Sequence, residues 1–355
     1  SSLSRKPHII ACSGTRRARR IHVRYHCPRY PALGRSCLPK RKRTLHESRD
    51  SRCRHPGRRH RPHASARGGG HARGPCTHRA RGTPGALAGA TVALTNKVVI
   101  DAELIDALPD LELICVLATG TNNIDMQAAK ARGIEVRNVT AYGTASVAQH
   151  TLMLMLALAN RLPLYMRDVA AGRWNDSPMF CLLDHRTLQL AGKHLVIVGH
   201  GELGRAVAHL AEAFGMRVTF AARPGNEAHD SRPALASLAG ELDVLSLHCP
   251  LNDETRHLVD ADMLARFKPG ALLLNCARGG IIDESAALDA LRNGTLGGLG
   301  VDSLPDEPPR EGHALIDALQ EGHNLIVTPH SAWISPEARA NVVRLTVDNL
   351  RHWLA

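Results

Sequence analysis

Apolar positions from about residue 90 onward follow two alternating patterns. Short runs that are almost wholly apolar, such as residues 113–118 and 194–198, are separated by stretches whose apolar residues recur every three or four positions. Runs that are apolar on both faces are typical of buried parallel strands, and the longer stretches are typical of amphipathic helices. This alternation predicts an α/β fold built on parallel sheets.

Two groups of elements follow from this pattern. The first group has strands at 91–95, 113–118 and 135–139 and helices at 101–108 and 125–132, with Asp101 as a cap and Gly133 as a stop. The second group has strands at 194–198, 217–222, 242–248, 271–275, 299–301 and 325–328. Helical patterns or turns separate these six strands, so we expect a second doubly wound unit.

A long apolar helix is expected between the groups, at about residues 145–161. Its apolar residues lie on more than one face. Two interpretations carry equal weight: a helix buried between domains, or a helix with one face at a subunit interface.

Charge divides the chain at about residue 85. Residues 1–85 hold 23 basic and 2 acidic side chains, a net charge of +21, whereas residues 86–355 hold 22 basic and 31 acidic ones, a net charge of −9. The overall value of +12 therefore describes neither part. Arg, His, Pro, Gly and Ser dominate the basic leader, and we expect little packed structure there because it has too little apolar surface.

Four interpretations of the leader compete. Basic runs at 16–20 and 40–43 would suit a nucleic-acid-binding arm, although we do not expect this chain to bind nucleic acid. An organellar transit peptide is also rich in Arg and poor in acids, but rarely so long. A zinc module would draw on two Cys-x-His pairs, formed by Cys53, His55, Cys76 and His78. The chain has no Cys-x-x-Cys spacing, so we expect no metal site.

The interpretation we favour for the leader is a shifted reading frame in GC-rich coding DNA. Ordinary patterning resumes abruptly near Ala86. On this hypothesis the first strand and helix of the opening domain are missing, which would leave a sheet edge unpaired.

The compartment follows from cysteines and apolar runs. Four scattered cysteines, Cys115, Cys181, Cys249 and Cys276, lie mostly in strand-like runs, which is typical of free thiols in a reducing compartment. No apolar run approaches the ~20 residues that span a bilayer. We therefore expect a cytoplasmic protein without a membrane partner.

A glycine-rich turn links residues 194–198 to a helical stretch. Gly199 permits a tight turn, Gly201 lets the backbone approach a pyrophosphate, and Gly204 allows close helix–strand packing. With Glu202 and Leu203, these glycines open a helix whose N-terminus would bind the phosphates of a dinucleotide. The motif predicts an NAD or NADP site.

The end of the next strand bears on the choice between the two cofactors. An acidic residue there would bind the ribose hydroxyls of NAD, but the chain has Ala221, Ala222, Arg223 and Pro224. With no carboxylate to repel a 2′-phosphate and Arg223 able to pair with one, we expect NADPH to be used well, alongside NADH.

Three charged residues follow strand ends in the second unit: Arg278, Glu307 and His330. Ligands of open α/β sheets bind beyond the carboxyl ends of the strands, so all three are expected at one crevice. His330 is a candidate general acid, Glu307 would hold its other ring nitrogen, and Arg278 would bind carboxylate and carbonyl oxygens.

Several segments together resemble the D-isomer-specific 2-hydroxyacid dehydrogenase family. They are VGHGELGR, NCARGGIIDESAAL, GVDSLPDEPP and TPHSAW, with ATGTNNIDMQAAKARGI and NVTAYGTASVAQHT before them. The resemblance implies that Arg278, Glu307 and His330 are the catalytic residues and that Asp302 holds the nicotinamide amide. It also implies a Rossmann domain at 148–331, inserted into a flavodoxin-like substrate domain at 86–147 and 332–355.

The remaining site residues are expectations of the same resemblance. The cofactor contacts would include Cys249, Pro250, Cys276, Ala277, Asp302 and His330. The substrate contacts would include Asn96, Lys97, Thr119, Gly120, Thr121, Arg278 and Trp333. A homodimer is expected as well.

Trp333 in HSAW resembles the glycerate dehydrogenase and hydroxypyruvate reductase branch of the family. We therefore expect reduction of hydroxypyruvate or glyoxylate to D-glycerate or glycolate. Two alternatives stay open. One is another branch, of the D-lactate or phosphoglycerate type, the latter disfavoured because no regulatory domain follows Ala355. The other is a nucleotide-sensing binding protein with impaired catalysis.

Overall fold

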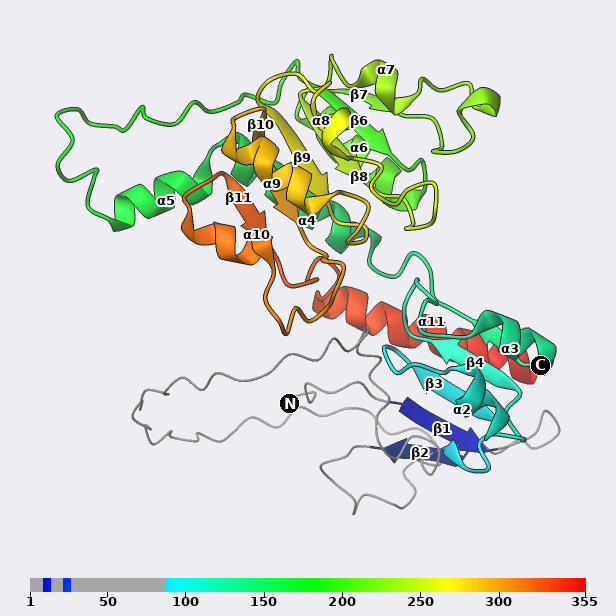
Figure 1. Ribbon diagram of the computed structural model, residues 1–355. Helices are drawn as coiled ribbons and strands as arrows, with labels where there is room; N and C mark the ends of the chain where they lie inside the picture. Colours follow the sequence, from blue (N-terminus) through cyan, green and yellow to red (C-terminus); the bar gives the residue numbers. More distant parts are fainter. Residues whose placement is uncertain (1–8, 14–21, 27–86) are drawn as a thin grey trace, which may run out of the picture. The chain divides into compact units, whose positions relative to one another are not determined.

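The computed structural model describes residues 9–13, 22–26 and 87–355 (Figure 1). They form two compact units: the described residues up to Val139 together with Thr346–Ala355, and Thr140–Leu345. Both units are α/β, as the pattern of apolar runs predicts. The domain boundaries expected at 147/148 and 331/332 both fall inside the second unit.

The sheet of the first unit has the order β2-β1-β3-β4-β5. Strands β3 (Val92–Thr95), β4 (Leu113–Val116) and β5 (Glu135–Arg137) run parallel, as expected. Strands β1 (Ile9–Ser13) and β2 (His22–His26) extend the sheet in antiparallel fashion, with β1 directly beside β3.

These two strands correct our expectation for the basic leader. Residues 9–13 and 22–26 are paired in the sheet, so the edge of β3 that we expected to be unpaired carries a neighbour. The physical reason is local: Ile9, Ile10, Val23 and Tyr25 favour strands, and the edge of β3 offers unpaired backbone groups. The rest of the leader, including the candidate zinc ligands, lies outside the described residues.

Two short helices cover one face of this sheet. The Asp101 carboxylate accepts the Leu104 N–H at 2.9 Å and caps α2 (Ala102–Asp106), as predicted. Asp125 caps α3 (Met126–Ala131) in the same way. Successive side chains of a strand point to opposite faces of the sheet and so belong to two clusters. Ile114 packs with these helices. Leu113 packs with Trp353 of α11 (Pro336–Leu354) in the other cluster.

The second unit is built on six parallel strands in the order β11-β10-β9-β8-β6-β7, each near its predicted place. They are β6 (His194–Val198), β7 (Arg217–Phe220), β8 (Val244–Leu247), β9 (Ala271–Asn275), β10 (Leu296–Val301) and β11 (Leu325–Val327). The chain runs from β6 outward to β7 and returns to β8 on the other side of β6. The carboxyl ends of β6 and β8 therefore flank the switch point where such sheets bind ligands.

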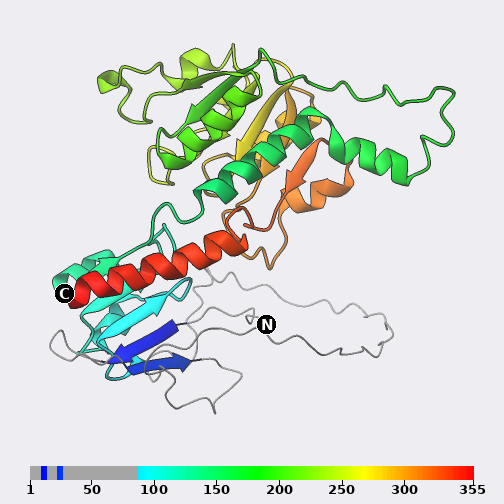
Figure 2. The same cartoon turned by 180° about the vertical axis from the view of Figure 1, so that it is seen from behind.

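Helices cover both faces of this sheet, because the strands carry apolar side chains on both faces. One face packs on α7 (Leu235–Leu238), α8 (Ala261–Leu264), α9 (Glu284–Arg292) and α10 (Ala314–Asp317), the last continued by the 3-10 turn η2 (Ala318–Gln320). The other packs on α4 (Thr144–Ala159) and α6 (Glu202–Ala213), which Figure 2 shows in front of the strands.

The long apolar helix predicted between the groups is α4. Its residues Leu154, Met155 and Leu158 are fully buried against the sheet and α6, which explains why it is apolar on more than one face. Within the described residues, no helix is both long and apolar enough to cross a membrane.

One part of the second unit extends away from its sheet (Figure 1). It consists of α5 (Leu162–Ala170) and residues 171–189, and we call it the arm. The arm exposes large apolar side chains, namely Leu162, Met166, Val169, Trp174, Met179, Phe180 and Leu183, with Phe180 91% and Leu183 73% exposed.

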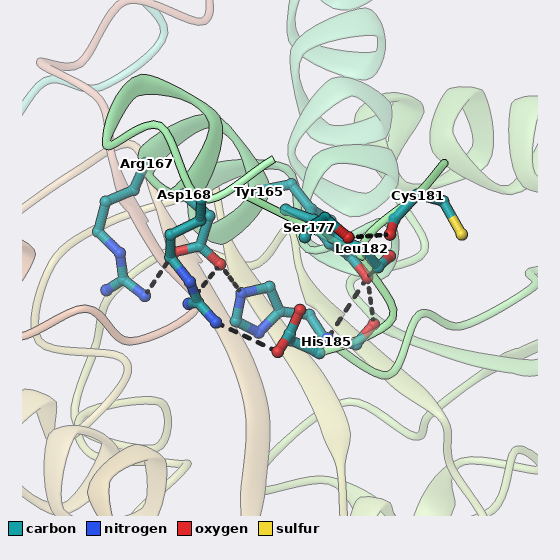
Figure 3. Close-up of polar contacts among 9 residues, drawn as sticks. Tyr165, Arg167, Asp168, Ser177, Cys181, Leu182 and His185 are labelled. Carbon is teal, nitrogen blue, oxygen red and sulfur yellow. Dashed lines mark hydrogen bonds and ion pairs between the residues drawn. The ribbon is translucent and has the colours of Figure 1, made fainter. Parts of the chain in front are cut away.

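A buried carboxylate holds the arm together (Figure 3). Asp168 on α5 is only 2% exposed and lies 2.7 Å from His185 Nε2 and 3.0 Å from Arg173 Nη1. Burial alone would raise the pKa of Asp168, but the hydrogen bond with His185 and the charge of Arg173 outweigh it and lower that pKa. These contacts tie the start and end of residues 171–185 back to the helix.

The Asp168→Asn substitution should lower the melting temperature at pH 7, and the deficit should shrink as the pH falls. The folded-state pKa lies below the unfolded value of about 3.9, so the carboxylate contributes fully above that value and loses its contribution below it. Calorimetry between pH 7 and 3 measures the difference. Asp184→Asn, at the exposed Arg173 contact, is the control. A deficit that does not change with pH would contradict the ion-pair explanation.

Candidate active site

The predicted glycine motif forms the turn between β6 and α6. Gly199 has φ of 110°, and a Cβ there would lie 2.3 Å from the carbonyl oxygen of His248 at the end of β8. A Cβ on Gly204 would meet the Gly199 carbonyl oxygen at 2.0 Å. Both positions therefore require glycine because the backbones of the two strand ends and the helix touch.

Gly201 differs from the other two glycines. A Cβ there would meet no atom within 4 Å, so the fold itself leaves this position open. Gly201 is the N-cap of α6 and provides no side-chain cap, which leaves N–H groups of the first turn for an anion. Glu202 turns aside and accepts a hydrogen bond from Thr144 Oγ1 at 2.7 Å. These features fit the pyrophosphate of a dinucleotide.

The end of β7 holds a carboxylate that the sequence reasoning missed. Asp230 accepts the backbone N–H of Arg223 at 2.8 Å, which corrects the expectation that no acid lies near this position. Arg232 binds the same carboxylate through Nε at 2.9 Å and Nη2 at 2.5 Å, and with the Arg223 N–H it lowers the pKa of Asp230. Asp230 stands seven residues beyond Arg223, and no strand pattern signals their proximity.

Predicted cofactor residues also follow β8 and β9. Cys249 and Pro250 follow β8 past His248, and Cys276 and Ala277 follow β9 directly. Burial raises the pKa of Cys249 to about 11 and that of Cys276 to about 12. Both thiols are therefore neutral at physiological pH.

The predicted histidine and glutamate come together in the structure. His330 Nδ1 lies 2.6 Å from Glu307 Oε2, and the other carboxylate oxygen accepts the Leu304 N–H at 3.0 Å. The carboxylate can only accept, so Nδ1 carries a proton and Nε2 is the nitrogen available to a ligand. The side chains are 28% and 30% exposed, which leaves them accessible.

Arg278 follows β9 in a turn that Asn275 shapes. The Asn275 side chain accepts the Ala277 N–H at 3.0 Å and donates to the Arg278 carbonyl at 2.7 Å. Tyr142, which the sequence reasoning did not single out, is close enough to Arg278 for its charge to oppose the burial that raises the Tyr142 pKa. Its ring also packs edge-on against Trp333, with 6.2 Å between centroids.

Asp302 is buried at the end of β10, 2% exposed. Its carboxylate accepts hydrogen bonds from Thr328 Oγ1 at 2.6 Å and from the backbone N–H groups of Ser331 and Ala332 at 2.8 and 3.0 Å. Contact with the nicotinamide amide stays a prediction. Within the protein, Asp302 binds the segment that carries His330.

The remaining predicted substrate residues belong to the first unit. Asn96 and Lys97 follow β3, and Thr119, Gly120 and Thr121 follow β4, so both groups gather at the carboxyl edge of neighbouring parallel strands. Asn96 Nδ2 donates to the Leu117 carbonyl at 2.9 Å and Thr119 Oγ1 to the Val139 carbonyl at 3.1 Å. Their roles stay predictions.

Acidic, His and Cys side chains do not form a group of three or more suited to a metal ion in the part of the chain that the structure describes. The chemistry of the second unit instead points to a class. A glycine turn open to a pyrophosphate, at the switch point of a parallel sheet with a histidine–carboxylate pair, defines a dinucleotide-dependent oxidoreductase.

Comparisons with known proteins place the chain within that class. Residues 152–332 match the family model described as D-isomer specific 2-hydroxyacid dehydrogenase, NAD binding domain. The chain is 43% identical over 270 residues to a glycerate dehydrogenase of Methylorubrum extorquens, covering 76% of this chain and 84% of that protein. It is 34% identical to a hydroxypyruvate reductase of Blautia hydrogenotrophica, covering 75% and 82%.

Solved structures agree. D-lactate dehydrogenase from Aquifex aeolicus, complexed with NAD and lactic acid, superposes with a TM-score of 0.66 at 28% identity, covering 76% of this chain and 85% of that one. The chain belongs to the D-isomer specific 2-hydroxyacid dehydrogenase family, and it is an NAD-dependent oxidoreductase acting on a CH–OH group.

The glycine turn yields a contrast between two substitutions. Gly201→Ala should fold normally but weaken NADH binding, because its methyl group enters the space left for the phosphates. Gly204→Ala should lower the melting temperature by several degrees, because its methyl group meets the Gly199 carbonyl. Thermal unfolding and fluorescence titration with NADH measure both effects. Equal stability losses in the two variants would refute the distinction.

Proposed function

We propose that this enzyme reduces hydroxypyruvate and glyoxylate to D-glycerate and glycolate, using NADPH or NADH. The observation that carries the proposal is the pair of His330 and Glu307, 2.6 Å apart beyond the strand ends of a dinucleotide-binding sheet. The substrate is supported by two similar proteins, a glycerate dehydrogenase and a hydroxypyruvate reductase.

The protein residues divide the chemistry between them. The hydride for the carbonyl carbon of the 2-oxo acid would come from the nicotinamide of a cofactor held at the turn from Gly199 to Gly204. His330 Nε2 donates the proton that the carbonyl oxygen then needs, and takes it back in the reverse direction. Glu307 holds Nδ1, fixes the ring orientation and stabilises the imidazolium. Arg278 binds the carboxylate and polarises the carbonyl.

The backbone holds the cofactor in this proposal. The turn from Gly199 to Gly204 and the N-terminus of α6 bind the pyrophosphate. Arg232 pairs with the Asp230 carboxylate beside Arg223, so the Arg223 side chain would be able to pair with the 2′-phosphate of NADPH. In the first unit, the backbone near Thr119, Gly120 and Thr121 binds the substrate carboxylate.

We place the enzyme in the cytoplasm, which its free thiols support.

A substrate panel tests the function directly. Hydroxypyruvate, glyoxylate, pyruvate and phosphohydroxypyruvate are each assayed with NADH and with NADPH. We expect kcat/KM for the first two to exceed that for the others by at least about tenfold, with NADPH within about tenfold of NADH. Faster turnover of pyruvate or phosphohydroxypyruvate would move the enzyme to another branch of the family. A stronger preference for NADH would contradict the role of Arg223.

His330→Ala should lower kcat by about 10²- to 10⁴-fold while leaving the NADH dissociation constant nearly unchanged, because it removes the proton donor but no phosphate contact. Glu307→Gln should cost less, since the amide oxygen still accepts from Nδ1. His209→Ala, on the exposed side of α6, is the matched control. Near-normal turnover of His330→Ala would exclude the assignment.

We further propose that the enzyme is a homodimer formed through the arm. Exposed apolar side chains concentrate on α5 and residues 174–183, with Phe180 91% exposed, whereas α4 has only Met153 among its exposed large apolar residues. An apolar surface of this kind is typical of an interface. A second copy brings the same arm, which makes the contact self-complementary.

Replacing Phe180 and Leu183 together by Glu should convert the dimer to a monomer in analytical ultracentrifugation, because each charge would be buried in the interface. Phe214→Glu, 44% exposed beyond the end of α6, should leave the dimer intact. A wild-type monomer at micromolar concentration, or a double variant that stays dimeric, would exclude this interface.

A further inference from the structure

His330 has an unusual backbone conformation for a catalytic side chain. Its φ is 52°, in the left-handed region that is unfavourable for a residue with a Cβ. Such a conformation persists only where the surroundings hold it. Other groups must therefore hold the turn at residues 328–332.

The Asp302 carboxylate makes most of the hydrogen bonds that hold this turn. One oxygen accepts from the Thr328 hydroxyl and the Ser331 N–H, and the other accepts from the Ala332 N–H. Three hydrogen bonds thus clamp both sides of His330 onto one buried, 2% exposed group. The carboxylate must itself be kept in place, because a buried charge is stable only when it is fully hydrogen-bonded.

His150 on α4 completes the arrangement. Its Nε2 lies 3.0 Å from Thr328 Oγ1 and 3.4 Å from Asp302 Oδ1, and its side chain is only 14% exposed. The Thr328 hydroxyl has one proton, which it donates in the hydrogen bond to Asp302 at 2.6 Å. Its oxygen can then only accept from His150, so Nε2 carries a proton.

We propose that His150 is a positioning residue for catalysis. By donating to Thr328, His150 orients the hydroxyl toward Asp302 and fixes the turn that presents His330 to Glu307. A second hydrogen bond links α4 to the same segment, since Ser146 Oγ lies 2.5 Å from Ser335 Oγ. Helix α4 is thus attached to the segment that carries His330 on both sides of that residue. The proposal rests on the assignment of His330 as the proton donor.

The test compares His150→Leu with His150→Gln. Leucine removes the donor, whereas the glutamine amide can replace Nε2–H. We expect His150→Leu to lower kcat at least about tenfold, since small displacements of a catalytic group are costly, while the KM for NADH stays within about twofold. His150→Gln should recover kcat to within about threefold of wild type. Equal losses in both variants, or no loss in either, would overturn the proposal.

A matched control separates positioning from stability. His194 is also buried, and its Nε2 lies 2.8 Å from Thr219 Oγ1. His194 is the first residue of β6, at the end of that strand away from the site. His194→Leu removes a comparable histidine–threonine contact. It should lower the melting temperature but leave kcat within about twofold of wild type. If kcat falls as far as in His150→Leu, the effect of His150 is merely structural.

Hydrogen exchange gives a readout that needs no substrate. In His150→Leu, the peptide covering residues 329–333 should exchange faster because the Ser331 and Ala332 amides lose their fixed acceptor. The same peptide should be unchanged in His194→Leu. Unchanged exchange in His150→Leu would overturn the proposal. If wild type reduced none of the four 2-oxo acids, the proposed function would fail while exchange still decided the role of His150.

Discussion

The left-handed backbone at His330 is the constraint on which the site depends. A residue with a Cβ keeps this conformation only where its surroundings hold it. Here the buried Asp302 carboxylate holds the turn through three hydrogen bonds. The turn places Nδ1 against Glu307 and leaves Nε2 free for chemistry. Asp302 follows β10 and Thr328 follows β11. The parallel pairing of these strands therefore sets the distance between the Asp302 carboxylate and the Thr328 hydroxyl.

The sequence predicted what depends on local patterning. The six strands of the second unit, the Asp101 cap and the three glycines all follow from side-chain periodicity or from backbone sterics. The pairing of Glu307 with His330 was also expected, since both follow strand ends that share one edge. The catalytic role of either residue stays a prediction.

What the sequence could not predict depends on contacts between distant segments. Strands β1 and β2 were overlooked because composition was averaged over 85 residues, which hid two short stretches of strand-forming residues. Asp230 lies beside Arg223 only because the loop after β7 folds back. His150 and Tyr142 have no signature of their own, since each works through a partner on another element. In the sequence, His150 is only one of several polar residues within an otherwise apolar stretch.

The burial of Cys249 and Cys276, past the ends of β8 and β9, has a consequence for how these thiols react with oxidants. The thiolate is the form that reacts with peroxide and with alkylating reagents. With pKa values raised by burial to about 11 and about 12, Cys249 and Cys276 stay in the thiol form at neutral pH. Burial therefore keeps these two thiols in the form that reacts slowly with oxidants, although both follow strands at the carboxyl edge of the sheet.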